Sequence, residues 1–161
     1  MKHTLTLLAI AAFTICCFSC KKSESTSATP TTDYLIVGST GGFVGPMALT
    51  RYYLVNDGKL KADTTLTVST LPTSYSGFHF NYTLPQAQYD AFAADVLTTV
   101  PSELFGATGN SIGTGMPDVG YTDVRVQLSG HYYAWHFESD QSGSSAAVQA
   151  FVAKMKKIVS L

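Results

Sequence analysis

Apolar and polar residues alternate with a period of two on either side of Ser129 and Gly130. This period is typical of half-buried strands, and the pair between them is typical of a tight hairpin turn. If Ser129 and Gly130 form the turn, Asp123 lies opposite His136 on the outer face, together with Arg125. The core face then consists of Val124, Val126, Leu128, His131, Tyr133, Trp135 and Phe137.

Two segments instead carry apolar residues at helical spacing. The first follows Thr83 and Gln86, which have the spacing of a capping box, and continues to about Val100, where Pro101 ends it. The second runs over residues 144–159. Its predicted buried stripe consists of Val148, Phe151, Val152, Met155, Ile158 and Val159. Because each stripe is one-sided, each helix is expected to pack on a sheet.

Shorter extended segments precede the first helix. Residues 34–37 form an apolar strand, and residues 47–55 and 59–68 are predicted to pair across a turn at 56–58. Alternation over 78–82 predicts a further strand. This order predicts an α+β domain, with an antiparallel sheet of about five or six strands and two amphipathic helices packed on one face. The stretch 102–120, rich in Gly, Ser and Thr, is expected to be a long loop.

The amino terminus has the pattern of an export signal. A positive charge at Lys2, an apolar run over 5–18 and the small Ser19 before Cys20 indicate a lipoprotein signal cleaved between Ser19 and Cys20. Loose lipoboxes of this kind resemble those of Bacteroidota lipoproteins, which implies an outer-membrane lipoprotein facing the periplasm or the cell surface. An ordinary secretory signal cut nearby is the alternative.

The signal divides the chain into three parts. Residues 1–19 are the signal peptide, 20–32 are the acylated cysteine with a polar flexible tether, and 33–161 are a single α+β domain. Acyl chains on Cys20 would hold the protein to membrane lipid without a transmembrane helix.

Composition excludes several functional classes. All three cysteines lie in the signal or at the lipid site, so the domain has no disulfide and no thiolate nucleophile. Charge is sparse and balanced, with 10 Lys and Arg against 11 Asp and Glu, and therefore nucleic acid is not an expected partner. His79, His131 and His136 have no paired metal spacing, so neither a metal nor another cofactor is expected.

Two glycine-rich motifs resemble catalytic or phosphate-binding loops. Residues 109–113 match G-x-S-x-G, the nucleophile elbow of α/β-hydrolases, but no apolar strand precedes Gly109 and no helical pattern follows Gly113. Residues 38–45 lack the lysine of a P-loop and precede a strand. We interpret both as connections, and a small serine hydrolase using Ser111 with a histidine remains a secondary hypothesis.

A tyrosine-rich face gives another hypothesis, an accessory envelope lipoprotein that binds glycan or a neighbouring protein. Such a face would consist of Tyr52, Tyr53, Tyr75, Tyr132 and Tyr133, although these residues also suit sheet packing.

The stretch Thr40-Gly41-Gly42-Phe43-Val44-Gly45 is followed by an extended segment, a helix after Leu84-Pro85, a strand pair from Tyr121 and a closing helix. This order resembles emfourin, a family of small inhibitors of thermolysin-like zinc metalloproteases. The resemblance implies a binding protein that is not an enzyme, holds no zinc and blocks a protease with a loop within 39–45 or 106–116. The candidate binding residues are Ser39, Thr40, Gly41, Gly42, Phe43, Gly45, Asn110 and Ser111.

Overall fold

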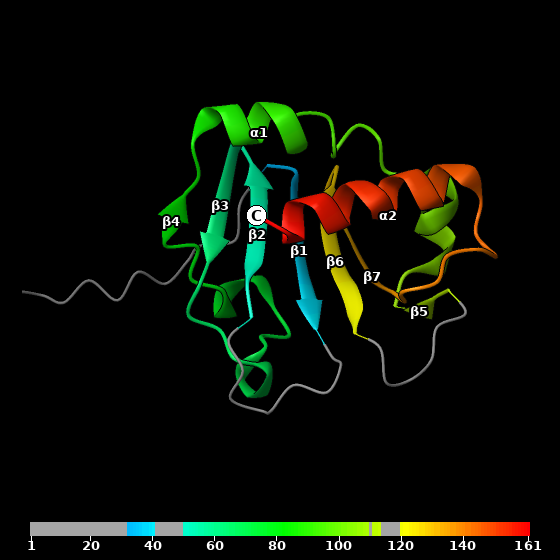
Figure 1. The fold of residues 1–161 in the computed structure, drawn as a ribbon, viewed down its shortest axis with the longest axis horizontal. Coiled ribbons are helices and arrows are strands. Elements are labelled where there is room, and N and C mark those ends of the chain that lie inside the picture. Colours follow the sequence, from blue (N-terminus) through cyan, green and yellow to red (C-terminus); the bar gives the residue numbers. More distant parts are fainter. Residues whose placement is uncertain (1–31, 41–49, 110, 114–119) are drawn as a thin grey trace, which may run out of the picture.

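The computed structural model describes residues 32–40, 50–109, 111–113 and 120–161, which form an α+β domain (Figure 1). Its strands are β1 (Tyr34–Thr40), β2 (Tyr52–Asn56), β3 (Lys59–Asp63), β4 (Tyr82–Thr83), β5 (Ser111–Ile112), β6 (Tyr121–Leu128) and β7 (His131–Phe137). Its helices are α1 (Gln86–Phe92) and α2 (Ala146–Val159), and short 3-10 turns cover Val68–Thr70, Tyr75–Gly77 and Ser102–Ala107.

One sheet contains all the described strands, in the order β4-β3-β2-β1-β6-β7-β5. Its neighbours are antiparallel except β5, which runs parallel to β7. The prediction of an α+β domain is confirmed. The predicted sheet is wrong in detail, because it has seven strands and is mixed. The additional strands are two residues long, too short for an alternating pattern to reveal.

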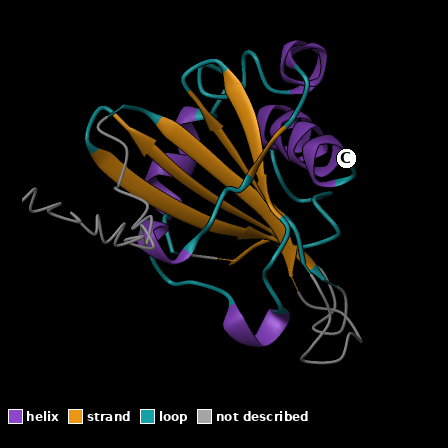
Figure 2. Cartoon of the chain, turned by 90° about the vertical axis from the view of Figure 1, so that its left-hand side faces the viewer, coloured by secondary structure: helices purple, strands orange, loops and turns teal. Residues whose placement is uncertain are grey.

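Both helices pack on the same face of the sheet, as Figures 1 and 2 show. The inward residues of α2 are Val148, Phe151, Val152, Met155 and Ile158, as predicted. They join one hydrophobic cluster with the inner face of the strands, at whose centre lie the fully buried Trp135 and Phe137. The indole Nε1 of Trp135 donates a 2.9 Å hydrogen bond to the carbonyl oxygen of Leu104, which ties the 3-10 turn at 102–107 to β7.

The opposite face of β1 and β2 is also covered. A second cluster forms there between the strands and the segment that follows β3, and it consists of Tyr34, Ile36, Tyr52, Leu54, Leu66 and Phe78. Because both faces of β1 are buried, its residues Tyr34 to Val37 form a continuous apolar run, with each side chain at most 1% exposed.

The two predicted hairpin turns are confirmed. Asp57 and Gly58 have φ of 49° and 68°, and Ser129 and Gly130 have φ of 50° and 81°, the positive values that such two-residue turns require. The second turn sets the predicted register, with Asp123 opposite His136 and Val124 opposite Trp135. His131 shares the face of Trp135 but is exposed, because it lies at the end of the hairpin.

These turns lie at the end of the sheet where β1 begins. The Asp33 carboxylate accepts a 2.7 Å hydrogen bond from the backbone N–H of Ser129, and Asn56 donates a 2.9 Å hydrogen bond to the Thr32 hydroxyl. The chain therefore enters the domain beside both hairpin turns.

The first helix is shorter than predicted. It ends at Phe92, since Ala93 leaves helical geometry at φ −127°, and residues 93–98 form turns. The Thr98 hydroxyl donates to the carbonyl oxygen of Asp95, a bond that competes with helical pairing. The predicted capping box is also wrong, because Pro85 is the N-cap and the Gln86 amide donates to Gly58 and Asp90 instead.

The segment 78–81 is not a strand, contrary to the prediction from its alternation. The backbone N–H of His79 donates a 2.5 Å hydrogen bond to the buried carboxylate of Asp63 instead of to a neighbouring strand. Phe78 and Phe80 stack at 5.4 Å and cover the second cluster. Within 102–120, predicted as a loop, the structure has a 3-10 turn and β5.

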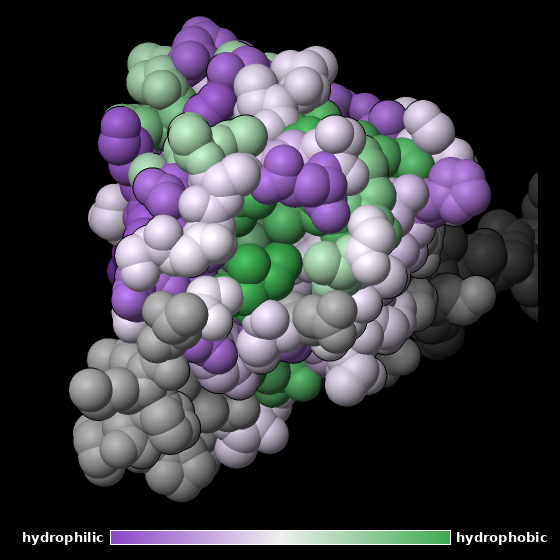
Figure 3. Space-filling view, turned by 90° about the vertical axis from the view of Figure 1, so that its right-hand side faces the viewer, coloured by the Kyte–Doolittle hydropathy of each residue, from purple (hydrophilic) through white to green (hydrophobic). Residues whose placement is uncertain are grey.

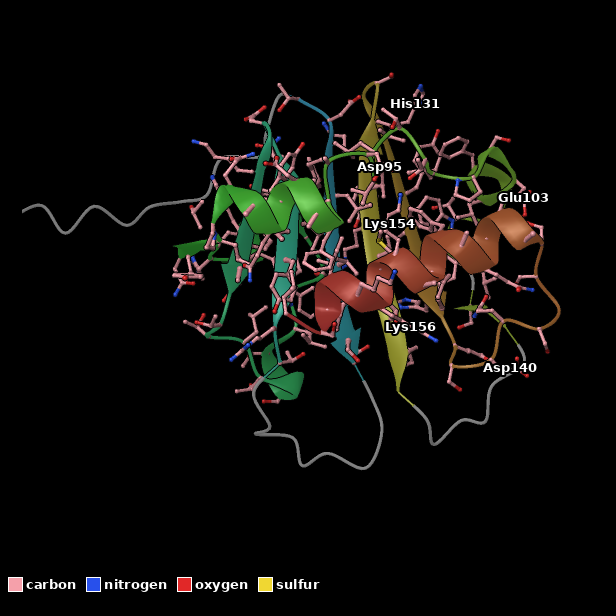
Figure 4. The ribbon with its side chains drawn as sticks, turned by 45° about the horizontal axis from the view of Figure 1, so that its top comes forward. Asp95, Glu103, His131, Asp140, Lys154 and Lys156 are labelled. Carbon is pink, nitrogen blue, oxygen red and sulfur yellow. The ribbon has the colours of Figure 1, made fainter. Side chains whose placement is uncertain are left out.

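A polar contact connects α2 to the turns that follow α1. Lys154 of α2 donates a 2.7 Å hydrogen bond to Asp95, in the turns after α1, and Figure 4 shows the two residues close together. The Asp95 side chain is 61% exposed, so this pair stabilises the fold by less than about 1 kcal/mol. The α2 helix begins at Ala146, after Ser145 accepts a 3.2 Å hydrogen bond from the N–H of Val148.

We predict that Gly38→Ala destabilises the domain by roughly 1–3 kcal/mol. A Cβ at Gly38 would lie 2.6 Å from the ring of Tyr52, which is fully buried and cannot move aside. Chemical denaturation measures the difference. The control is Gly106→Ala, because a Cβ there meets no atom within 4 Å. Equal unfolding free energies for the two variants would contradict the packing of Tyr52 over Gly38.

Candidate functional site

The glycine-rich connections of the chain start from one end of the sheet. Thr40 at the end of β1 pairs with Tyr121 at the start of β6. The Thr50 hydroxyl donates a 2.7 Å hydrogen bond to the carbonyl oxygen of Ser39, which holds together the two strands that residues 41–49 connect. Residues 114–119 connect Gly113, after β5, to the start of β6 at the same end.

The structure describes three of the predicted binding residues. Ser39 and Thr40 lie at this end of β1, and Ser111 lies in β5 at the edge of the sheet. The other candidates, Gly41, Gly42, Phe43, Gly45 and Asn110, lie outside the described residues.

A row of paired residues crosses the sheet near this end, on the face opposite the helices. In this row each residue pairs with the next one on the neighbouring strand. The row consists of Tyr52 of β2, Gly38 of β1, Asp123 of β6, His136 of β7 and Ser111 of β5. Paired residues on neighbouring strands point to the same face, so these side chains share one surface. Because Gly38 has no side chain, the ring of Tyr52 extends over it as far as Asp123.

Asp123 is the centre of this row and is 2% exposed. Its Oδ2 accepts hydrogen bonds from the Tyr52 hydroxyl at 3.1 Å and from Arg125 Nε at 3.0 Å. Its Oδ1 lies 3.3 Å from Nδ1 of His136, and no hydrogen bond forms between these two atoms. The contact is an ion pair only when the imidazole is protonated.

Arg125 connects this row to the segment that covers the second cluster. Its Nη1 donates a 2.6 Å hydrogen bond to the carbonyl oxygen of Pro72, and its guanidinium lies 5.2 Å from the ring centre of Phe78. A guanidinium over an aromatic face is attracted by the ring quadrupole.

The electrostatics of the row keep Asp123 ionised. Burial alone would raise the pKa of its carboxyl, but the nearby imidazole of His136 and the charge of Arg125 outweigh it, so the pKa is lowered. Burial and the Asp123 charge raise the pKa of the Tyr52 hydroxyl. Tyr52 therefore remains protonated and donates to Asp123.

Three buried polar side-chain atoms in the described part of the chain have no hydrogen-bond partner. They are Thr40 Oγ1, Asp123 Oδ1 and His136 Nδ1. All three belong to the face opposite the helices and to the end where the glycine-rich connections start. The Tyr121 ring meets the imidazole of His136 edge-on at 5.2 Å. Unsatisfied polar atoms are therefore concentrated at one place in the domain, beside the predicted binding segments.

Ser111, His136 and Asp123 follow one another across three strands, in the spatial order of a serine-hydrolase triad. Two requirements of that chemistry are missing among the described residues. No hydrogen bond connects the Ser111 hydroxyl to His136, and Ser111 lies in a strand, without the positive φ of a strained turn. The G-x-S-x-G match therefore does not form a nucleophile elbow at Ser111.

Most of the tyrosines that could have formed a binding face pack in the domain instead, the alternative that the sequence also allowed. Tyr52 and Tyr53 point to opposite faces and are 0% and 2% exposed. Tyr75 packs against Tyr34 at 5.0 Å, and Tyr133 stacks on Trp135 at 5.9 Å. The exposed tyrosines of the described residues are Tyr82, Tyr121 and Tyr132.

The sequence predicted one contact of the site and missed the rest. It placed Asp123 opposite His136, because a two-residue turn sets that register. It placed Arg125 on the same face as Asp123 without identifying the contact between them. It missed Tyr52, since the pairing of β1 with β2 and β6 leaves no local pattern. A glycine within the apolar strand at Gly38 is a signal for close approach of another residue.

The backbone N–H of His79 bonds to Asp63, the residue that pairs with Tyr52, whereas His131 lies at the other end of β7 from His136. Within the described ranges, no three His, Cys, Asp or Glu residues are grouped closely enough to hold a metal ion. None of the described helices combines the length and the apolar character needed to cross a membrane.

Comparison of the chain with models of protein families, with curated proteins and with solved structures finds no match.

We predict that Asp123→Asn lowers the free energy of unfolding at pH 7 by roughly 3 kcal/mol, because it leaves Arg125 without its buried counter-charge. The folded pKa of Asp123 is lowered, so its charge stabilises the fold above the usual carboxyl range, and this stabilisation is lost as the pH falls through the folded pKa. The difference between wild type and variant should therefore shrink below about pH 4.

Denaturation curves at a series of pH values measure this difference. Asp95→Asn is the matched control, since it removes an exposed carboxylate from an ion pair and should cost less than about 1 kcal/mol. A difference between wild type and Asp123→Asn that stays constant down to about pH 2 would contradict the ionised state of Asp123.

Proposed function

We propose that this chain is a membrane-anchored lipoprotein of the cell envelope that binds a protein partner, with a thermolysin-like metalloprotease as the first candidate, and is not an enzyme. The observation that supports this proposal is the common origin of the glycine-rich connections. Thr40 and Tyr121 pair at the ends of two central strands, so residues 41–49 and 114–119 both attach to the same end of a rigid sheet.

A binding function suits such an arrangement. Strands that are paired on both sides fix the ends of each connection, and binding residues concentrate on loops that a rigid scaffold positions. The hydrogen bond from Thr50 to Ser39 further fixes the base of the first connection. Under this proposal, the contacts to the partner come from Ser39 to Gly45 and from Asn110 and Ser111, and the protein itself needs neither zinc nor another cofactor.

Membrane attachment depends on Cys20, and we predict that it is acylated. When the full chain is produced in a bacterium with lipoprotein processing, it should fractionate with the membrane, and mass spectrometry should show an acylated Cys20 at the mature terminus. Cys20→Ser should leave the protein unacylated and release it from the membrane fraction. Wild-type protein that is soluble and carries no acyl group would contradict the lipoprotein proposal.

Partner binding is tested with the chain from Lys21 onward and a thermolysin-like protease. We predict inhibition of peptide hydrolysis that approaches one inhibitor per enzyme. Phe43→Ala should raise the inhibition constant at least about tenfold, because an aromatic residue at the centre of an interface typically contributes more than about 1 kcal/mol. Tyr132→Ala is the control, since it removes a 49% exposed aromatic side chain from β7.

Two outcomes would contradict this proposal. One is the absence of inhibition at about a hundredfold molar excess, which excludes any affinity useful to an inhibitor. The other is turnover of an activated ester by the wild-type chain that disappears in Ser111→Ala, which would favour the serine hydrolase.

A further inference from the structure

An open pocket lies on the helix-bearing face of the sheet, where neither helix covers β2 and β3. Its floor is apolar and consists of Tyr53, Ala62 and Leu84, all at most 8% exposed. Its rim is formed by Arg51, Thr64, Asn81, Tyr82, Gln88 and Leu161. In Figure 1, α1 crosses β2 and β3 at the end where these two strands are joined, and α2 ends beside β2.

The volume of this pocket suits a small molecule, and its exposed lining is more polar than apolar. It holds about 490 Å³, within the range of roughly 300–1,000 Å³ that is typical of ligand pockets. Such pockets combine an apolar floor with a few polar groups that orient the ligand. Its lining residues come from β2, β3, β4, α1 and their flanking segments, and Leu161 comes from the segment after α2. A separate hollow, with hydrophobic residues surrounded by hydrophilic ones, lies on the opposite side of the domain, where β5 lies (Figure 3).

The polar side chains of the rim are available to a ligand. Arg51, Asn81 and Gln88 make no side-chain hydrogen bond or ion pair with any described residue, unlike the neighbouring Gln86, which donates two. Each of the three carries a planar amide or guanidinium group, which can form two hydrogen bonds to one ligand. Tyr82, beside them, is 56% exposed, the largest value among the exposed large hydrophobic residues described.

We propose that this pocket binds a short saccharide that carries a carboxylate. A pyranose ring has a face of C–H groups and a rim of hydroxyls, which match an exposed tyrosine ring and planar donors and acceptors at the edge of a pocket. The charge of the site selects among saccharides. Arg51 is the only charged side chain among the described residues that line the pocket, so an acidic sugar gains an ion pair that a neutral sugar does not.

This inference is independent of partner binding through the glycine-rich connections. Of the candidate residues, the three that the structure describes, Ser39, Thr40 and Ser111, do not line the pocket. Failure of the protease experiment therefore leaves the saccharide site intact, and failure of the saccharide experiment leaves the protease proposal intact.

The test uses two disaccharides with the chain from Lys21 onward. The acidic probe is N-acetylglucosaminyl-N-acetylmuramic acid and the neutral probe is di-N-acetylchitobiose. Both should shift the amide side-chain NMR signals of Asn81 and Gln88, and the acidic probe should bind about two- to fivefold more tightly, the gain expected from one exposed ion pair. Arg51→Gln should remove the preference for the acidic probe and retain binding of the neutral one.

Tyr82→Ala should raise the Kd of both probes at least about tenfold, whereas Tyr132→Ala, which removes an exposed tyrosine on β7, should leave both unchanged. Both variants change exposed side chains, so the fold is retained. The absence of signal shifts at about 10 mM of either probe, or equal weakening by the two tyrosine variants, would overturn the proposal. Equal affinity of wild type for the two probes would overturn the selection by Arg51.

Discussion

The buried carboxylate of Asp123 is the interaction on which much of this domain depends. A charge that is 2% exposed must be compensated by donors, and the donors come from different parts of the chain. Tyr52 reaches it from β2 across β1, and Arg125 connects it to Pro72 in the segment that covers the second cluster. One anion thus connects β2 to β6 across β1, and through Arg125 it connects β6 to a covering segment. The glycine in β1 is part of the same constraint, because any side chain there would exclude Tyr52.

The sequence predicted the elements whose pattern is local and strong. The hairpin over 121–137 follows from alternation and a two-residue turn, and α2 follows from a one-sided apolar stripe. The segment 78–81 shows the limit of such patterns. Its apolar and polar residues alternate as in a strand, but the backbone N–H of His79 donates to the Asp63 side chain instead of to a neighbouring strand. The site was predicted to the same extent. The pair of Asp123 and His136 was found, but Tyr52, which comes from a strand distant in the sequence, was not.

The short outer strands protect the sheet from pairing with other chains. β4 and β5 have two residues each, yet they occupy the edges of β3 and β7. Further bonds extend this cover, because the N–H of Gly109 donates to the carbonyl oxygen of Ala134 and the N–H of Leu84 donates to that of Leu60. Long exposed edges promote aggregation, so these covered edges limit pairing of the sheet with other chains.

The direction of β1 has a consequence for how the domain would stand on a bilayer. The chain enters beside the hairpin turns at Asp57 and Ser129, and it leaves β1 at Thr40, at the other end of the sheet. Seven residues of strand separate these ends by about 23 Å. If lipid is attached upstream at Cys20, the glycine-rich end is the one farther from that attachment. A bulky protein could then approach it from the aqueous side without colliding with the lipid headgroups.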